Sequence, residues 1–351
     1  MDNFNEYLPL IGICVSEEKR LMCELVERRI KKFLGKANFI RFYIEDLDFE
    51  MLQVKGDVFE KDTKEWKEGI FPFPDAIYVQ CHIDQEVLKQ IEEVIGKKVF
   101  NNFIFDKWEG WSLLAKDHLL RDNLPVTVIL ESKMDLKQCL FMYQDIMLKP
   151  VDVSKGHSSR GIFRVKLKKD GKIKVFFAKR LKMKEKEFSS FKDFFNWFSG
   201  KTSAKDYIIQ QSIQTVTRGE NITDIRLNMN KNAKGKWKVS CLLFRVAANG
   251  SHMIPKTATA LTIENLIKVY PQDKIKWEEI EKSIILLGHK ICHVFEQQGY
   301  HMANLGIDLG LDGSGHLWIF EVNPLPFPLD GTVKDHSLTK PIEYALSLVS
   351  K

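Results

Sequence analysis

The sequence predicts three units: an α/β domain at the N-terminus, followed by two α+β domains. A length of 351 residues is typical of a chain with two or three domains. Strand-like and helix-like patterns alternate over residues 1–105, which indicates a parallel sheet with helical crossovers. Farther along, alternating apolar and polar residues flank glycine-containing turns, and this pattern predicts hairpins and therefore antiparallel sheets.

The first unit, residues 1–105, is expected to form the parallel sheet. Its strands are short apolar runs, and its helices have apolar residues at helical spacing and end at or near a glycine. The predicted strands cover residues 8–15, 39–47, 75–81 and 99–103. The predicted helices cover residues 20–35 and 86–98.

The middle unit, residues 106–205, begins with a residue suited to cap a helix. Asp106 precedes helical spacing over residues 107–121, and Asn123 and Pro125 are expected to end that helix. Asp170 and Gly171 are typical of a two-residue hairpin turn. The further predicted elements are a helix over 133–144, a strand over 145–151, the hairpin over 162–180 and an aromatic-rich helix over 190–200.

The last unit, residues 206–351, is dominated by two hairpins. The first turns at residues 233–235, and the second turns at the glycine-rich residues 312–315. Between them lies the longest helical pattern of the chain. The predicted elements are a strand over 207–213, hairpins over 223–250 and 305–323, and helices over 277–299 and 341–350.

Composition excludes several classes of protein. The net charge is only +6, with 53 basic residues interleaved with 47 acidic ones, so we expect no nucleic-acid partner. The six cysteines form no C-x-x-C pair and are expected to be reduced thiols. The N-terminus has no basic, signal-like region, and no apolar stretch approaches the roughly 18 residues of a membrane span. We therefore expect a cytoplasmic protein without a membrane partner.

An acidic cluster is predicted in the last hairpin. Glu321 and Asn323 are two residues apart in one strand, so their side chains share a face. Asp308 lies in the partner strand, and hairpin pairing is expected to bring it onto a neighbouring position. Two carboxylates and an amide oxygen suit Mg²⁺. The alternative is a solvated sheet edge in which Asn323 caps a turn.

A loop with anion-binding character follows the strand that ends at Lys149. Its glycines allow close approach of a ligand to the backbone, and successive N–H groups in a turn can surround an anion. The spacing is not that of a Walker P-loop. The alternative is a flexible polar connection between strands. The loop contains Ser154, Lys155, Gly156, His157, Ser158, Ser159, Arg160 and Gly161.

Two arginines occupy the strands of the first long hairpin. Arg226 and Arg245 each stand in an otherwise apolar run, and Asp224 shares a face with Arg226. A half-buried arginine needs a partner, and a phosphate oxyanion is well matched to its planar guanidinium. The alternative is a structural ion pair, either between Asp224 and Arg226 or between an arginine and a glutamate.

The order of these features resembles the ATP-grasp superfamily, whose members clamp ATP between two α+β domains behind an N-terminal α/β domain. The stretches "NNFIFDKWEGWSLL", "TDIRLNM" and "GIDLGLDGSGHLWIFEVNPLP" look most like the YheC/YheD family of spore-coat-associated ATP-grasp proteins. Ligases that add glutamate to a ribosomal protein share the D-x-R and E-x-N motifs. The features run, in order, through Lys107, Lys149 with its loop, a strand ending at Gln210, Asp224 with Arg226, Arg245, Asp308, and Glu321 with Asn323.

The resemblance implies roles for these residues. Lys107 and Lys149 would contact ATP phosphates, with Lys116 as a rival for the role of Lys107. The loop would cover the phosphates, and a hinge over residues 210–213 would contact the adenine edge through its backbone. The implied nucleotide-binding residues are Lys107, Lys149, Ser154, Lys155, Gly156, Ser158, Gly161, Gln210, Gln211 and Ile213.

The same resemblance implies an ATP-dependent carboxylate–amine ligase. Arg226 and Arg245 would stabilise the transferred phosphate and the acyl group. Asp308, Glu321 and Asn323 would hold Mg²⁺, with Mn²⁺ as an alternative. The partners would be ATP, a carboxylate substrate and an amine acceptor, and a homodimer is left open. No side-chain nucleophile is required.

One segment departs from the family pattern. Residues 251–260 lack the expected glycine-rich piece near the acceptor site and carry Pro255 and Lys256 instead. Lys256 is either a contact for a changed second substrate or part of a loop without a role in chemistry. Two further functions stay open: a spore-associated ATP-binding protein without ligase activity, and a phosphotransferase that stops after moving the γ-phosphate.

Overall fold

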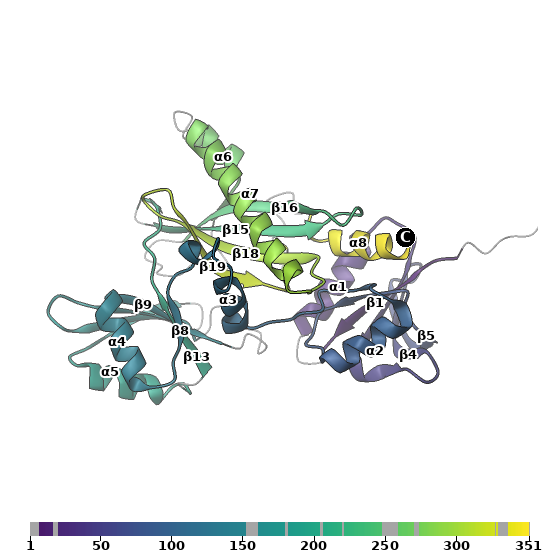
Figure 1. Ribbon diagram of the computed structural model, residues 1–351, viewed down its shortest axis with the longest axis horizontal. Helices are drawn as coiled ribbons and strands as arrows, with labels where there is room; N and C mark the ends of the chain where they lie inside the picture. The colour runs from purple at the N-terminus through teal and green to yellow at the C-terminus, as the bar shows by residue number, and fades with distance from the viewer. Residues whose placement is uncertain are drawn as a thin grey trace, which may run out of the picture.

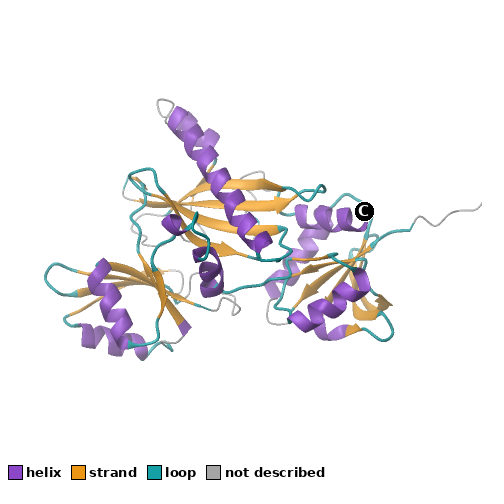
Figure 2. Ribbon diagram, viewed as in Figure 1, coloured by secondary structure: helices purple, strands orange, loops and turns teal. Residues whose placement is uncertain are grey.

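The described part of the chain is organised around three β-sheets with helices packed against them (Figures 1 and 2). The C-terminal sheet lies centrally in Figure 1, between the N-terminal unit and the middle unit. No helix among the described residues has the length and apolarity needed to cross a bilayer. The computed structural model describes residues 7–16, 20–151, 161–179, 182–203, 206–219, 221–247, 259–269, 274–326, 328 and 336–350.

The N-terminal sheet has the parallel core that the sequence predicts. Its strands follow the order β3-β4-β2-β1-β6-β7, and β1 pairs in parallel with β2 and β6. The elements are β1 (Leu10–Val15), α1 (Arg20–Lys32), β2 (Asn38–Tyr43), a 3-10 turn (Ile44–Asp46), β3 (Leu47–Asp48), β4 (Gln53–Glu60), β5 (Glu65–Pro72), β6 (Ala76–Val79), α2 (Gln85–Ile95) and β7 (Val99–Phe100).

The hairpin of β4 and β5 is absent from the prediction. It extends the parallel sheet with antiparallel strands, since β4 pairs with β2 on one side and with β5 on the other. Strand β5 is largely exposed, with Ile70 69% accessible to solvent. A strand with so little burial carries a weak apolar alternation, and this explains why the pattern was missed.

The middle sheet is antiparallel, as predicted, in the order β12-β11-β10-β9-β13-β8. The strand over residues 207–211 was predicted to open the last unit, but it lies in this sheet between β9 and β8. The elements are β8 (Thr127–Ile129), α4 (Lys133–Tyr143), β9 (Asp145–Pro150), β10 (Phe163–Leu167), β11 (Ile173–Lys179), β12 (Lys182–Phe188), α5 (Phe191–Ser199) and β13 (Tyr207–Gln211).

Helix α3 (Lys107–Ala115) precedes the middle sheet and is shorter than the predicted span of 107–121. Its end tightens, because the N–H groups of Lys116 and Asp117 donate to carbonyls three residues earlier. A short 3-10 turn (Arg121–Asn123) follows. The sequence therefore located the start of this helix correctly. The predicted end, residue 121, lies beyond the observed end at Ala115.

The C-terminal sheet runs in the order β17-β16-β15-β18-β19, with β14 beside β15. Helix α7 covers one face, and its Gly288 lets the helix approach closely, since a Cβ there would lie 2.5 Å from Leu227 Cδ2. The elements are β14 (Thr217–Arg218), β15 (Asn221–Lys231), β16 (Trp237–Val246), β17 (Thr259–Leu261), α6 (Ile263–Val269), α7 (Lys274–Gln297), β18 (Asn304–Leu311), β19 (Leu317–Asn323) and α8 (Lys340–Val349).

The last helix returns to the first sheet. Ile342 and Ala345 of α8 belong to the same buried cluster as Ile11 and Tyr78 of the N-terminal sheet. The fully buried Arg29 of α1 donates to the carbonyl oxygens of residues 337 and 338, at 2.7 and 2.5 Å. The two ends of the described chain are therefore joined through one core (Figure 1).

Candidate functional site

The predicted acidic residues meet in register on one face of the C-terminal sheet. Arg226 on β15 stands opposite Asp308 on β18, and Asp308 stands opposite Glu321 on β19. Asn323 is two residues beyond Glu321 and pairs with Gly306. The pairing slips just after Asp308, so Phe320 has no partner on β18 and forms a bulge. The predicted convergence of the two carboxylates and the amide is thus the observed backbone arrangement.

Asp308 is held by both predicted arginines. Its Oδ1 lies 2.9 Å from Arg245 Nη2 and 3.1 Å from Arg226 Nη1. Arg245 also binds Asp224 with two hydrogen bonds of 2.7 and 2.5 Å. Burial raises the pKa of Asp224 above the usual carboxyl range, although the Arg245 guanidinium opposes that rise. Asp224 is therefore paired with Arg245 across the hairpin, whereas the sequence alternative paired it with Arg226, which contacts Asp308 instead.

Two hydrogen-bond donors of the Arg226 side chain have no acceptor among the described residues. Its Nε and Nη1 are buried and make no hydrogen bond in the described part of the chain. The 3.1 Å approach of Nη1 to Asp308 is a charge contact without hydrogen-bond alignment. Buried guanidinium donors without acceptors are costly, so this side chain is suited to receive an anion.

The two predicted lysines enter the site from different elements, Lys107 from α3 and Lys149 from β9. Lys107 stands in the first turn of α3, where the side chain of Asp106 accepts from Glu109 N–H and Glu109 reciprocates at the backbone of Asp106. Its Nζ lies 3.3 Å from Glu321 Oε1, and its side chain is only 6% exposed. Lys116, the rival candidate, is exposed beyond the end of α3. The geometry therefore favours Lys107.

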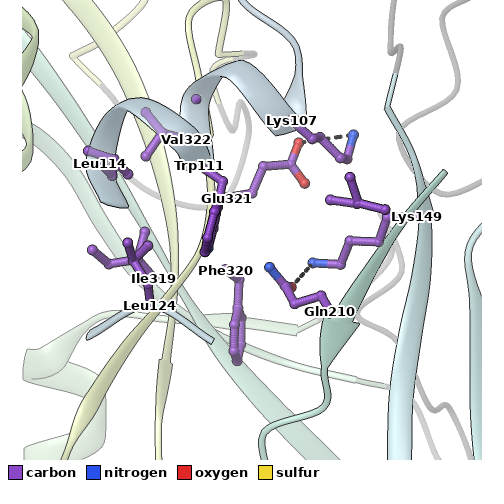
Figure 3. A pocket seen from close by; sticks show the side chains of 12 residues that line it. Lys107, Trp111, Leu114, Leu124, Lys149, Gln210, Ile319, Phe320, Glu321 and Val322 are labelled. Atoms are coloured by element: carbon purple, nitrogen blue, oxygen red, sulfur yellow. Dashed lines mark hydrogen bonds and ion pairs between the residues drawn. The ribbon is translucent and has the colours of Figure 1, made fainter. Parts of the chain in front are cut away.

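Lys149 is held by a neutral side chain. Its Nζ donates to Gln210 Oε1 at 2.6 Å, and Gln210 Nε2 donates to Thr127 Oγ1 at 3.0 Å. Burial lowers the pKa of Lys149 to about 8, with Glu321 opposing that change. Gln210 thus contributes its side chain to the site, as Figure 3 shows.

A pocket opens where α3, β9, β13 and β19 meet (Figure 3). Aromatic side chains at Trp111 and Phe320 were missed by the sequence reasoning. Trp111 is four residues after Lys107, so helical spacing already placed it on the same face; nothing in the sequence marks the bulge that presents Phe320. The lining residues are Lys107, Gly110, Trp111, Leu114, Leu124, Lys149, Ile208, Gln210, Ile319, Phe320, Glu321 and Val322.

The predicted hinge lies at the end of β13. The N–H of Gln211 donates to Val126 O at 2.8 Å, so that group is already used within the sheet. The N–H of Ile213 donates to no group in the stretches the structure describes. Of these two hinge N–H groups, that of Ile213 is therefore the one left for a ligand.

The predicted glycine-rich loop is described only at its end. Ser154, Lys155, Gly156 and Ser158 lie outside the described residues, as does Lys256. Gly161 has φ +82°, and a Cβ there would lie 2.9 Å from Tyr207 Oη, so only glycine suits this position.

The oxygen set fits a hard divalent cation. Asp308 and Glu321 are directly opposed on neighbouring strands, and Asn323 shares their face. The Asn323 side chain makes no hydrogen bond within the described ranges, which leaves its amide oxygen for a ligand. No group of three or more His, Cys, Asp or Glu side chains suited to a metal occurs in those ranges. A site here would therefore depend on the amide and on ligand oxygens.

Two curated proteins are similar in sequence to this chain. The chain is 24% identical over 296 residues to endospore coat-associated protein YheD of Bacillus subtilis (strain 168), covering 81% of this chain and 63% of YheD. It is 24% identical over 298 residues to endospore coat-associated protein YheC of the same strain, covering 82% of this chain and 80% of YheC. The chain thus spans less than two thirds of YheD.

Solved structures share the fold at low sequence identity. The VanG D-Ala:D-Ser ligase from Enterococcus faecalis superposes with a TM-score of 0.56 at 13% identity, over 97% of this chain and 98% of that one. The ATP-grasp ligase PsnB, solved with a phosphomimetic variant of its minimal precursor, Mg and ADP, gives 0.51 at 12% identity, over 99% and 100%. The N5-carboxyaminoimidazole synthase from Aspergillus clavatus gives 0.55 at 10% identity, over 97% and 77%.

These superpositions confirm the predicted ATP-grasp fold. The model of the family described as YheC/D like ATP-grasp matches residues 96–348, which is most of the chain. The resemblance drawn from the motifs is confirmed by this match. The protein belongs to the YheC/D-like ATP-grasp family.

Proposed function

We propose that this protein is an ATP-dependent ligase that joins a carboxylate to an amine through an acylphosphate. One observation carries the proposal: Lys107 on α3 and Lys149 on β9 converge with Glu321 around a single pocket. Two buried ammonium groups beside a carboxylate that faces Asp308 form a place for a metal-bound polyphosphate.

The side chains of the proposed site have different roles, which follow from their charge and position. Lys107 and Lys149 bind the phosphate oxygens of ATP. Trp111 and Phe320 line the apolar part of the pocket and exclude water from the nucleotide. Ile213 N–H donates to the adenine edge. We assign Ser154, Lys155, Gly156, Ser158 and Gly161 to the cover of the phosphates.

The transferred phosphoryl group would lie against the arginines. A substrate carboxylate oxygen attacks the γ-phosphorus, ADP leaves, and an amine then expels phosphate to leave an amide. Arg226 donates its unused N–H groups to the transferring oxygens, and Arg245 holds Asp308 in place. Asp308, Glu321 and Asn323 would hold Mg²⁺ or Mn²⁺, which neutralises phosphate charge when bound.

The partners follow from this chemistry. ATP, a carboxylate substrate and an amine acceptor are the proposed small-molecule partners, with amino acids and short peptides as the first classes to try. We propose the cytoplasm as the location. The relatives named as endospore coat-associated make spore association a second location to examine.

One assay separates the candidate reactions. The protein is incubated with Mg²⁺-ATP, pooled amino acids and small peptides, while phosphate release and new masses are followed. A condensed product with ADP and phosphate supports ligation, whereas a stable phosphorylated product supports a phosphotransferase. Absence of nucleotide binding by calorimetry would exclude both and favour a role without catalysis.

Replacing Glu321 by Gln tests the proposed metal role. The amide keeps the size of the side chain and removes its charge, so we expect turnover to fall at least about a hundredfold with the fold intact. Phosphate release and circular dichroism measure the two effects. Glu296→Gln is the matched control, because Glu296 binds Lys231 and Trp237 at a different place on the same sheet. Unchanged turnover in Glu321→Gln would remove the metal role.

A further inference from the structure

Asn101 occupies an unusual position for a polar residue. It directly follows β7, is fully buried, and has φ +53°, in the left-handed region. Apart from glycine, asparagine is among the few residues that adopt this conformation readily. Glycine would satisfy the backbone alone, so the presence of Asn101 directs attention to what its side chain does.

The Asn101 side chain uses its full hydrogen-bonding capacity on the ends of two strands. Its Oδ1 accepts from the N–H groups of Ala303 and Asn304, at 2.9 and 3.1 Å. Its Nδ2 donates to the carbonyl oxygens of Asn304 and Pro324, at 2.9 and 2.8 Å. The amide orientation is fixed by these partners, because N–H groups only donate and carbonyls only accept.

The bond to Pro324 reaches the residue that follows Asn323. The pairing of β18 with β19 ends at Gly306 and Asn323, and a proline has no N–H with which to extend it. Asn101 Nδ2 donates to Pro324 O from outside the sheet. Asn101 therefore ties the end of β19 to the start of β18, just where the proposed oxygen ligand stands.

The hydrogen-bond network extends to the N-terminal sheet and to the neighbouring strands of the C-terminal sheet. Asn304 Nδ2 donates to Tyr78 Oη of β6 at 2.9 Å, and Asn304 Oδ1 accepts from Asn230 of β15 at 3.1 Å. Ser240 Oγ lies 2.6 Å from Asn230 Oδ1. All of these side chains are buried. A satisfied buried network of this kind rigidifies its surroundings, so the N-terminal unit supplies a fixed reference for β18 and β19.

We propose that Asn101 is a positioning residue for the cation site, which holds Asn323 in place through the carbonyl of Pro324. This inference rests on the proposed function, since it takes Asp308, Glu321 and Asn323 as the oxygen ligands. Residues that orient metal ligands without touching the metal change its affinity by about tenfold to a hundredfold when they are replaced.

The variant Asn101→Asp removes the hydrogen bond to Pro324 together with the one to Asn304 O. An aspartate keeps the size and both acceptor contacts with Ala303 and Asn304, but loses the donations to Asn304 and Pro324. Nucleotide binding is followed by calorimetry at a fixed ATP concentration while Mg²⁺ is varied. We expect the Mg²⁺ concentration at half-maximal binding to rise about tenfold or more, with metal-free ATP binding unchanged.

A control variant separates positioning from general loosening. Ser240→Ala removes a hydroxyl from the far end of the same network without touching Pro324, so the Mg²⁺ midpoint should stay at its wild-type value. If Asn101→Asp fails to fold, Asn101→Gly makes the same comparison with the left-handed backbone retained.

The possible outcomes distinguish the positioning role of Asn101 from the proposed function. A wild-type Mg²⁺ midpoint in a folded Asn101 variant, or an equal rise in Ser240→Ala, would overturn the positioning role and leave the proposed function standing. A wild-type protein that binds no nucleotide with Mg²⁺ would overturn the proposed function as well.

Discussion

Thr127 determines which end of the Gln210 amide faces Lys149. The Thr127 hydroxyl donates to Pro125 O at 3.0 Å, so its oxygen is left to accept from Gln210 Nε2. Gln210 must then turn Oε1 toward Lys149 Nζ. The ammonium donates to a neutral acceptor and not to a carboxylate, so it stays available to a phosphate. Thr127 was not among the sequence candidates, because a lone threonine carries no signal of this arrangement.

Replacing Thr127 by Val should weaken ATP binding. Valine keeps the shape but removes the hydroxyl, so Gln210 Nε2 loses its acceptor while Pro125 O keeps only the bond from Trp111 Nε1. The Gln210 amide is then free to turn its N–H groups toward Lys149. A cost of about 1–3 kcal/mol corresponds to a loss of roughly fivefold to a hundredfold in affinity. Calorimetric titration with ATP measures the loss. Thr127→Ser should restore binding, and equal affinities for the valine variant and wild type would contradict the assigned relay.

Among the elements, helix α3 positions Lys107 in the proposed site. Its first turn carries Lys107, and the reciprocal bonds between Asp106 and Glu109 fix where that turn begins. The helix is short, so its start matters more to its stability than in a long helix. The same type of capping box, made by Ser132 and Asp135, begins α4 away from the pocket.

These two capping boxes provide a matched pair of variants. Asp106→Ala and Ser132→Ala should each lower the free energy of unfolding by about 1 kcal/mol, because each removes one N-cap. Only Asp106→Ala should also raise the KM for ATP, because Asp106 caps the helical turn that carries Lys107. Urea unfolding and steady-state kinetics measure the two quantities. A similar rise in KM for both variants would show that the effect is general destabilisation.

For the molecule as a whole, the junction between the first and last units carries a titratable group. His301 stands between α7 and β18, with Nε2 2.8 Å from Tyr344 Oη of α8. Burial lowers the pKa of His301 to about 4, and the nearby Lys231 adds to that shift. The folded protein therefore keeps this imidazole neutral at a pH where the unfolded chain, with an ordinary pKa, binds a proton.

The junction should weaken in mild acid. Between the unfolded pKa of roughly 6.5 and the folded pKa of about 4, the unfolded state binds more protons, so stability falls as the pH falls. The loss contributed by His301 approaches about 3 kcal/mol near the lower limit. Denaturant unfolding at about pH 7 and about pH 5 should show a smaller pH dependence in His301→Gln than in wild type. Equal pH dependence would exclude His301 as its source.

The sequence by itself determined which residues could form the site and which strands carry them. The separation of Glu321 and Asn323 by two residues fixes a shared face in any extended strand, and the glycine-rich turn fixes Asp308 in the partner strand. The cap at Asp106 and the parallel core of the first unit are also local patterns. Each depends on spacing along the chain, which a sequence displays directly.

Only the tertiary structure decided how distant segments meet. The contact of Arg245 with Asp308, the contact of Lys107 with Glu321, and the bond from Asn101 to Pro324 join residues far apart in sequence. The placement of the 207–211 strand in the middle sheet and of α8 on the first sheet are of the same kind. No local pattern encodes them, because they are selected by burial and hydrogen bonding among surfaces that exist only after the sheets have formed.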